Sequence, residues 1–269
     1  MFKVIGEILT ENIISKHVLL NKSEFLKSNP VCKYKHLKWK YLENPNGESF
    51  GINGYHNREL TSKIAYQKKI FHYKNKTLAG ANLCDLIIKK KFRNIDVFLQ
   101  LTNQFFIKKD ITRSELSIMV PNEISINLYK RLLKLNSIGS FELRFMPIIT
   151  SILFNKSKLK LLKVITNLNL KILNLVNTFF QNLLNFSFSS KKPYKKDYKI
   201  MINKYYTNEV IQGDRSWEWF KWRYSSDSKI KYFVESIYFK RQLIGYFSYR
   251  KIKKFGFDII LILEIVLIK

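Results

Sequence analysis

The sequence predicts an α/β (α+β layer) protein with a mixed, mostly antiparallel sheet flanked by helices, followed by a helical linker and part of a second sheet. Three observations support this: strand-like segments at residues 48–92, helix-like segments alternating with short apolar runs up to residue 149, and a strand pattern that recurs after residue 205. We therefore expect a domain at residues 1–150, an amphipathic helix and polar linker at 151–197, and a partial second domain at 198–269.

Residues 48–92 predict three strands of an antiparallel meander. The segments ESFGINGYH, KIAYQKKIFHY and KTLAGANLCDLII are separated by the turn signals Asn-Arg-Glu and Lys-Asn-Lys. The third segment is apolar enough to be buried on both faces of a sheet. It should therefore be a central strand.

Helices and further strands follow this meander. Apolar residues at roughly helical spacing in FRNIDVFLQLTNQFFIKK predict a helix directly after the buried strand. ELSIMVP predicts a short buried strand, EISINLYKRLLKL an amphipathic helix, and SFELRFMPI a final strand.

Residues 152–186 predict one helix with a single apolar seam, at positions 161, 165, 168, 172, 175, 179, 183 and 186. The seam is compatible with packing on a neighbouring domain, pairing with a partner helix, or peripheral contact with a membrane. The uncharged part, residues 172–186, is interrupted by Asn and Gln and is shorter than the roughly 20 apolar residues that a membrane span needs. Residues 187–197 predict a polar linker.

Composition limits the partners and the compartment. The net charge of +28 comes mainly from lysine, since 39 of the 48 basic residues are Lys, and these are spread along the whole chain. Sequence-specific nucleic-acid readers favour Arg for its bidentate fork, so we predict no specific nucleic-acid partner. Cys32 and Cys84 lack metal-ligand spacing, and the N-terminus lacks a clean signal-peptide core, which together indicate no metal site and a cytoplasmic location.

An internal repeat gives the chain its most informative pattern. A shift of 183 residues superimposes WKY at 39–41 on WRY at 222–224, and the hairpin turn follows both stretches at the same distance. The other residues that coincide in the two halves are Lys38 with Lys221, Tyr55 with Tyr238, Arg58 with Arg241, Leu60 with Leu243 and Tyr66 with Tyr249. After the second hairpin, a four-residue shortening places Glu264 at the position of Asp85.

These stretches resemble bacterial members of the GNAT superfamily of acyl-CoA N-acyltransferases that have two tandem GNAT-like halves and are often associated with surface-polysaccharide gene clusters. The segments WKYLENPNG and RSWEWFKWRY are similar to the W-[KR]-Y stretch that opens each half in these proteins. CDLIIKKKFRNIDVF occupies the place of the phosphate-binding loop, and VPNEISINLYKRL is similar at Pro121, Asn122, Ser125 and Tyr129. The resemblance covers residues 36–149 and 205–268.

The resemblance implies direct acyl transfer from acetyl-CoA or another acyl-CoA to a small-molecule amine, such as an amino sugar or an amino acid. The acyl-CoA would lie where two central strands part, with its pyrophosphate at a helix N-terminus. Tyr129 would protonate the leaving thiolate, and Asp85 would act as a substrate-side carboxylate or base. The phosphate loop would consist of Arg93, Asn94, Ile95, Asp96, Val97 and Phe98.

Two positions depart from the family pattern. Asp96 stands where the loop usually has a glycine, and its carboxylate would repel a pyrophosphate, although Lys89, Lys90, Lys91 and Arg93 are close in sequence. Leu133 replaces a glycine after the Tyr-x-[Lys/Arg]-Leu stretch. Three interpretations therefore stay open: an N-acyltransferase, a GNAT-fold protein that has lost its activity, and a basic protein that contacts membranes through residues 152–186. The sequence does not determine the oligomeric state.

Overall fold

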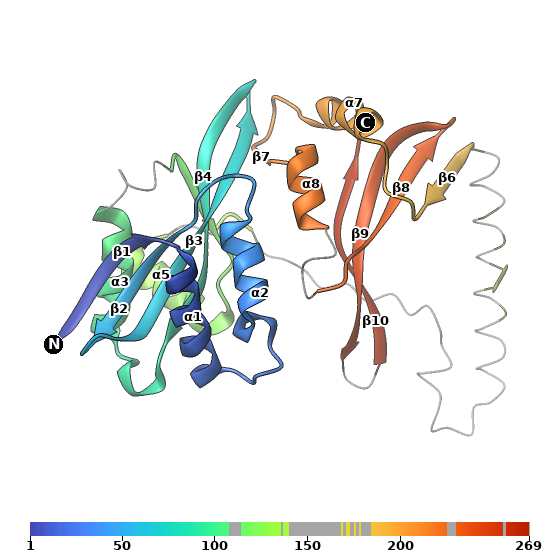
Figure 1. Cartoon of the computed structure of the whole chain (residues 1–269). Helices are drawn as coiled ribbons and strands as arrows, with labels where there is room; N and C mark the ends of the chain where they lie inside the picture. The colour runs from blue at the N-terminus through green and yellow to red at the C-terminus, as the bar shows by residue number, and fades with distance from the viewer. Residues whose placement is uncertain are drawn as a thin grey trace. The chain divides into compact units, whose positions relative to one another are not determined.

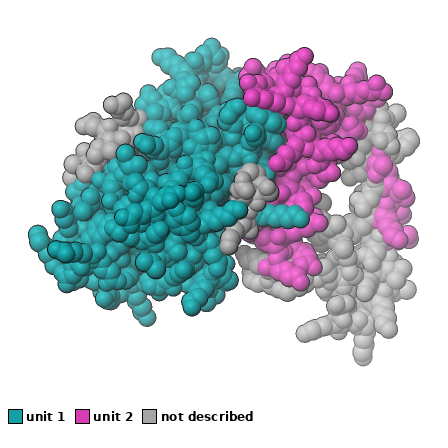
Figure 2. Space-filling view, in the orientation of Figure 1, with its two compact units in different colours: residues 1–136, 206–231 teal, residues 137–205, 232–269 magenta. Residues whose placement is uncertain are grey.

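The computed structural model shows two compact units (Figures 1 and 2). It describes residues 1–107, 114–135, 137–139, 168, 171, 172, 175, 178, 184–224, 230–254 and 257–268. The first unit contains Met1–Asn136 and Tyr206–Lys231, and the second contains Ser137–Tyr205 and Tyr232–Lys269. The predicted partial second domain was instead residues 198–269. Residues 206–231 group with the first unit because they add strand β7 to its sheet and because Trp222 stacks on Trp39.

The first unit is built on a sheet with the strand order β1-β2-β3-β4-β5, to which β7 adds by pairing with β3. Its strands are β1 (Phe2–Ile8), β2 (Phe50–His56), β3 (Glu59–Tyr73), β4 (Lys76–Ile88), β5 (Leu116–Met119) and β7 (Gln212–Gly213). All pairs are antiparallel except β4 with β5. The predicted meander and the strand at ELSIMVP are confirmed. Strand β1 was not predicted.

Two hydrophobic clusters lie on opposite faces of this sheet, because successive residues of a strand point to opposite sides. On one face, α3 (Ile95–Ile107) packs against β1, β2 and β3, and its Val97 and Leu101 join Ile64 and Tyr66 of β3. On the other face, Ala65 of β3 lies among residues of α1 (Glu11–Glu24) and of the segment around Tyr41. Helix α3 and α5 (Glu123–Leu133) confirm the predicted helices, whereas α1 was not predicted.

Both W-[KR]-Y stretches are helical, a conformation that the sequence analysis did not assign to them. Short 3-10 and α-helical turns, η1 (Pro30–Cys32) and α2 (Tyr34–Leu37), lead into a π-helical turn, η2 (Lys38–Leu42), which carries Trp39. Helix α8 (Trp217–Arg223) carries Trp222. Its N-cap is Ser216, whose hydroxyl accepts a hydrogen bond from the Trp219 amide. The two indole rings stack with 4.9 Å between their centroids, and each indole N–H donates to the backbone carbonyl of the other tryptophan, at 2.9 and 2.8 Å.

The second unit contains a four-stranded antiparallel sheet with the order β10-β9-β8-β6. Its elements are β6 (Phe186–Ser189), α7 (Lys195–Tyr205), β8 (Phe233–Phe239), β9 (Gln242–Lys254) and β10 (Phe257–Leu267). When β2–β3 is shifted by 183 residues, β8 has the bounds of β2 and β9 begins where β3 begins. The bulge position and the register also agree, with Tyr55 opposite Leu60 and Tyr238 opposite Leu243. The prediction of a polar linker at 187–197 was wrong in part, because residues 187–189 belong to β6 and α7 begins at Lys195.

Two predictions fall largely or wholly outside the described residues. The final strand SFELRFMPI lies outside them, as does most of the 152–186 helix; Leu168, Ile172 and Leu175 from its seam are helical and exposed. Within the part of the chain that the structure describes, every helix is too short or too polar to cross a bilayer.

Candidate functional site

Strands β4 and β5 part at the position where the resemblance places acyl-CoA. Their parallel pairing runs only from Gly80–Leu116 to Leu83–Met119, and β4 continues to Ile88 without β5. On its other edge, Ala65 pairs with Cys84 and Lys63 with Ile87, so that Asp85 and Leu86 stand opposite the single residue Ile64. This β-bulge bends β4 away from β5 and re-aims the Asp85 side chain.

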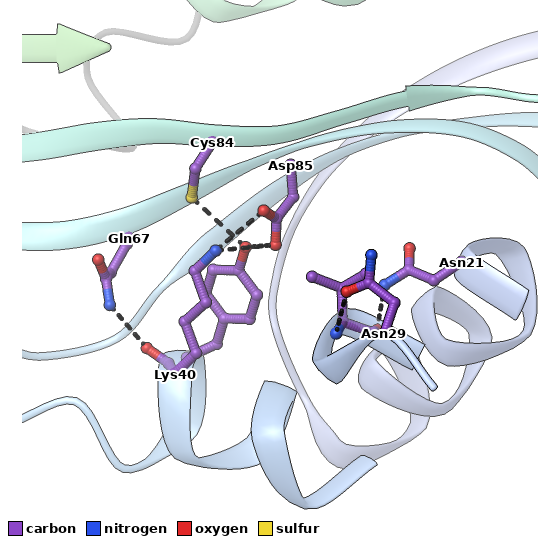
Figure 3. A network of polar contacts seen from close by, with 8 residues as sticks. Asn21, Asn29, Lys40, Gln67, Cys84 and Asp85 are labelled. Carbon is purple, nitrogen blue, oxygen red and sulfur yellow. Dashed lines mark hydrogen bonds and ion pairs between the residues drawn. The ribbon is translucent and has the colours of Figure 1, made fainter. Parts of the chain in front are cut away.

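Asp85 is the centre of a compact polar network under the bulge (Figure 3). The Lys40 ammonium lies 2.9 Å from both carboxylate oxygens, and the Tyr41 hydroxyl donates to Oδ2. The Tyr41 hydroxyl also lies 3.4 Å from the Cys84 sulfur, and the Gln67 side-chain amide donates a 3.0 Å hydrogen bond to the Lys40 carbonyl. The Lys and Tyr of the first W-[KR]-Y stretch are therefore held by the Asp of the buried strand.

This network keeps Asp85 ionised. Burial alone would raise the pKa of Asp85, but Lys40, Lys63 and the Tyr41 hydroxyl outweigh it and hold that pKa well below its usual range. A carboxylate with a strongly lowered pKa is a weak base, and proton uptake would disrupt its bonds to Lys40 and Tyr41. Asp85 also has a φ of 53°, a left-handed conformation that Asp tolerates better than most residues. These contacts favour a structural role over the predicted role as a base.

Lys63 and His17, which were not predicted as site residues, are also buried on this face of the sheet. Lys63 is fully buried and stands opposite Asn53, which accepts a 2.8 Å hydrogen bond from His17 Nε2 and donates to Glu7. Lys63 Nζ and His17 Nδ1 have no hydrogen-bond partner among the described residues. Burial lowers the pKa of Lys63 to about 8, with Asp85 opposing the change and Lys40 adding to it.

Replacing this ammonium with an apolar side chain should stabilise the protein. We expect Lys63→Met to raise the free energy of unfolding by about 1–3 kcal/mol at pH 7, since a buried charge without its own partner is costly. The folded-state pKa of about 8 lies below the ordinary 10.5, so wild-type stability should rise with pH through that window, by roughly 3 kcal/mol from this group. The advantage of the variant should disappear by about pH 10.5.

Urea unfolding at pH 7 and at pH 10 measures both effects. The matched control is Lys76→Met at an exposed position at the start of β4, which should change stability by less than about 0.5 kcal/mol. A Lys63→Met variant less stable than wild type at pH 7 would show that the ammonium has a stabilising partner.

Tyr129 lies near the place where β4 and β5 part. It is buried on α5, and its ring meets the edge of Phe98 of α3 at a centroid distance of 5.5 Å. It is near enough to Tyr66 to raise the pKa of that hydroxyl, and Tyr66 pairs with Leu83, the last β4 residue joined to β5. Burial raises the pKa of Tyr129 to about 12, so its hydroxyl is protonated at neutral pH and is a weaker acid than that of an exposed tyrosine. Helix α5 continues through Leu133 and ends at Lys134 in a left-handed conformation.

The predicted phosphate loop forms the start of α3, but its groups are engaged within the chain. Asn94 caps the helix, since its side-chain oxygen accepts from the Val97 amide at 2.8 Å and its carbonyl accepts from the Phe98 amide. Arg93 donates to Glu24 at 2.6 Å and to the Ile88 carbonyl at 2.9 Å. Val97 and Phe98 are buried in the core, whereas Ile95 and Asp96 are exposed in the first turn.

Comparison with solved structures identifies the fold. A conserved protein of Enterococcus faecalis V583, described as a probable N-acyltransferase, aligns with the whole of this chain at 10% identity and a TM-score of 0.56. The chain has the GNAT fold. It spans 59% of the length of that protein.

Single GNAT domains align with about half of the chain. An acetyltransferase from Clostridium acetobutylicum, solved with acetyl-CoA, matches 54% of this chain and 96% of its own at 14% identity and a TM-score of 0.42. An acetyltransferase from Trypanosoma brucei matches 54% of this chain and all of its own, at 11% identity and a TM-score of 0.40. No protein-family model and no curated protein matches the chain.

Proposed function

We propose that the chain is an acyl-CoA-dependent N-acyltransferase, which transfers an acetyl or other acyl group to the amine of a small molecule such as an amino sugar or an amino acid. The observation that carries this proposal is the parting of β4 and β5 after Leu83 and Met119, next to a bulge and to a buried, protonated tyrosine. Acyl-CoA would bind in this opening.

The chemistry requires three events. The neutral amine attacks the thioester carbonyl, the carbon–sulfur bond breaks, and Tyr129 donates its proton to the leaving thiolate. Because Asp85 is held by Lys40 and Tyr41, water is the better acceptor for the proton that the amine loses. Asp85 then acts by fixing the bulge of β4 in place.

We also infer that the second sheet is a partial copy of the first. The identical offset of 183 residues in the hairpins and in the tryptophan pair supports this. Cys32 and Cys84 are free thiols, which supports the inference of a cytoplasmic location.

A second candidate is a GNAT-fold protein that does not bind acyl-CoA. It is favoured by the start of α3, where Asn94 satisfies the Val97 amide, Arg93 is bound to Glu24, and Asp96 places a negative charge in the first turn. A pyrophosphate at this helix would have to displace or tolerate all three.

Calorimetric titration with acetyl-CoA distinguishes the two candidates. We expect weak binding by the wild-type protein and about fivefold tighter binding by Asp96→Gly, because about 1 kcal/mol of charge repulsion is removed and the backbone becomes accessible. Asp96→Asn removes the charge alone and should give part of the gain. The matched control Glu123→Gln, in the exposed first turn of α5, should bind as wild type does. If millimolar acetyl-CoA binds neither wild type nor Asp96→Gly, the second candidate is correct.

A further inference from the structure

Strand β10 forms one edge of the second sheet, and its outer edge is unpaired within the described residues. The strand follows the β8–β9 hairpin and pairs antiparallel with β9, in the place that β4 has after the β2–β3 hairpin of the first sheet. The outer edge of β4 is partly occupied, because β5 pairs with Gly80–Leu83. The order of the second sheet instead ends at β10. A row of backbone N–H and C=O groups is therefore available to another strand.

One face of β10 is apolar and exposed. Ile262 and Ile265 stand opposite Tyr249 and Phe247 of β9, which are two positions apart, so all four side chains point to the same face of the sheet. On the other face, Val266 is buried. An open edge beside an exposed apolar face is typical of an interaction surface. The large aliphatic side chains of β10 on the exposed face are Ile260, Ile262, Ile265 and Leu267, which are 48%, 55%, 63% and 50% exposed.

The composition of β10 favours pairing of the strand with itself. Free edge strands are usually protected by lysine, yet this lysine-rich chain has neither Lys nor Arg in Phe257–Leu267. The neighbouring strand β9 carries Lys251, Lys253 and Lys254. Residues 259–263 of β10 are all Ile or Leu, so two antiparallel copies of this run meet without opposing like charges. A two-fold axis brings the same edge of two protomers together in this antiparallel orientation.

We propose that β10 is an interface between two copies of this chain, in which the two β10 strands pair antiparallel about a two-fold axis and join the two second sheets into one. The bulge between Ile262 and Glu264 limits the regular ladder to Phe257–Ile262, so the pairing is centred there. With the axis at Leu261, Ile260 of one protomer lies opposite Ile262 of the other, and these cross-strand pairs bury part of the exposed aliphatic face. The interface does not depend on acyl-CoA binding or on the proposed transferase activity.

Sedimentation velocity of the full chain at protein concentrations from about 1 to about 100 µM tests the proposal. We expect a monomer–dimer equilibrium with a micromolar dissociation constant, and association weaker by at least about tenfold in Ile260→Lys and in Ile262→Lys, because a lysine on an edge strand opposes pairing. Each copy carries a formal net charge of +28, so association should strengthen as the NaCl concentration rises. Hydrogen exchange of the β10 amides should be slower at high than at low protein concentration.

The matched control is Leu19→Lys, which makes the same change at an exposed position of α1 in the first unit and should dimerise as wild type does. Circular dichroism and the thermal midpoint show whether each variant is folded. A folded wild-type chain that stays monomeric, or an equal loss of association in Leu19→Lys, would overturn the proposal. Exchange of the β10 amides that does not depend on protein concentration would also overturn it, as would attachment of a monomeric chain to anionic vesicles through this strand.

Discussion

Replacing Trp39 with alanine should lower the free energy of unfolding of the first unit by about 3–5 kcal/mol. The substitution removes a buried aromatic side chain that is 3% exposed, its stacking on Trp222, and the hydrogen bond that the Trp39 indole donates to the Trp222 carbonyl. The Trp222 indole N–H would also lose its acceptor geometry as the segment relaxes. Urea unfolding followed by far-UV circular dichroism measures the loss without relying on tryptophan fluorescence.

Phenylalanine variants separate stacking from hydrogen bonding. Trp39→Phe and Trp222→Phe each keep an aromatic ring and lose one N–H donor, so each should cost about 1–2 kcal/mol. Because the two tryptophans form one contact, the double alanine variant should cost clearly less than the sum of the single variants. Strict additivity would contradict the reciprocal pair.

The strands of the meander and helices α3 and α5 could be predicted because each combines local periodicity with turn or cap signals. Asn122, for example, caps α5 by accepting from the Ser125 amide at 2.8 Å. Strand β1 was missed because FKVIGEI lacks a clear alternation, and its burial pattern is correspondingly mixed. The helical form of the W-[KR]-Y stretches was missed because tertiary contacts between the two tryptophans stabilise helices of only four to seven residues.

The repeat pointed to the residues of the site but not to their contacts. Trp39, Lys40 and Tyr41 stood out because they recur as Trp222, Arg223 and Tyr224, and Asp85 stood out because Glu264 takes its place. That Lys40 and Tyr41 bind Asp85 depends on a bulge in β4, which single-residue patterns do not reveal. From the sequence, Lys63 is expected to face solvent on an alternating strand. It is buried because α1, which was not predicted, covers that face of the sheet.

The last prediction concerns the charge of Asp85. We expect Asp85→Asn to lower the free energy of unfolding of the first unit by about 3–5 kcal/mol at pH 7, because it removes the ion-pair partner of Lys40 and the nearby negative charge that partly offsets the Lys63 ammonium. Asparagine has nearly the same shape and tolerates the positive φ, so the change reports the charge. Adding Lys63→Met to Asp85→Asn should recover part of the loss.

The pH dependence gives this prediction its sign. Asp85 has a lowered folded-state pKa, so its contribution is present at pH values above the ordinary aspartate pKa of about 4 and is lost as the pH falls below it. The difference between wild type and Asp85→Asn should therefore be largest between about pH 5 and pH 7, shrink in acid, and shrink again at higher pH as Lys63, with its pKa of about 8, loses its proton. Glu11→Gln is the matched control, since it breaks a solvent-screened carboxylate–lysine pair with Lys38 at 2.7 Å and should change the free energy of unfolding very little. If Asp85→Asn costs no more than Glu11→Gln, the Asp85 carboxylate does not hold this network together and is free to act as the base in acyl transfer.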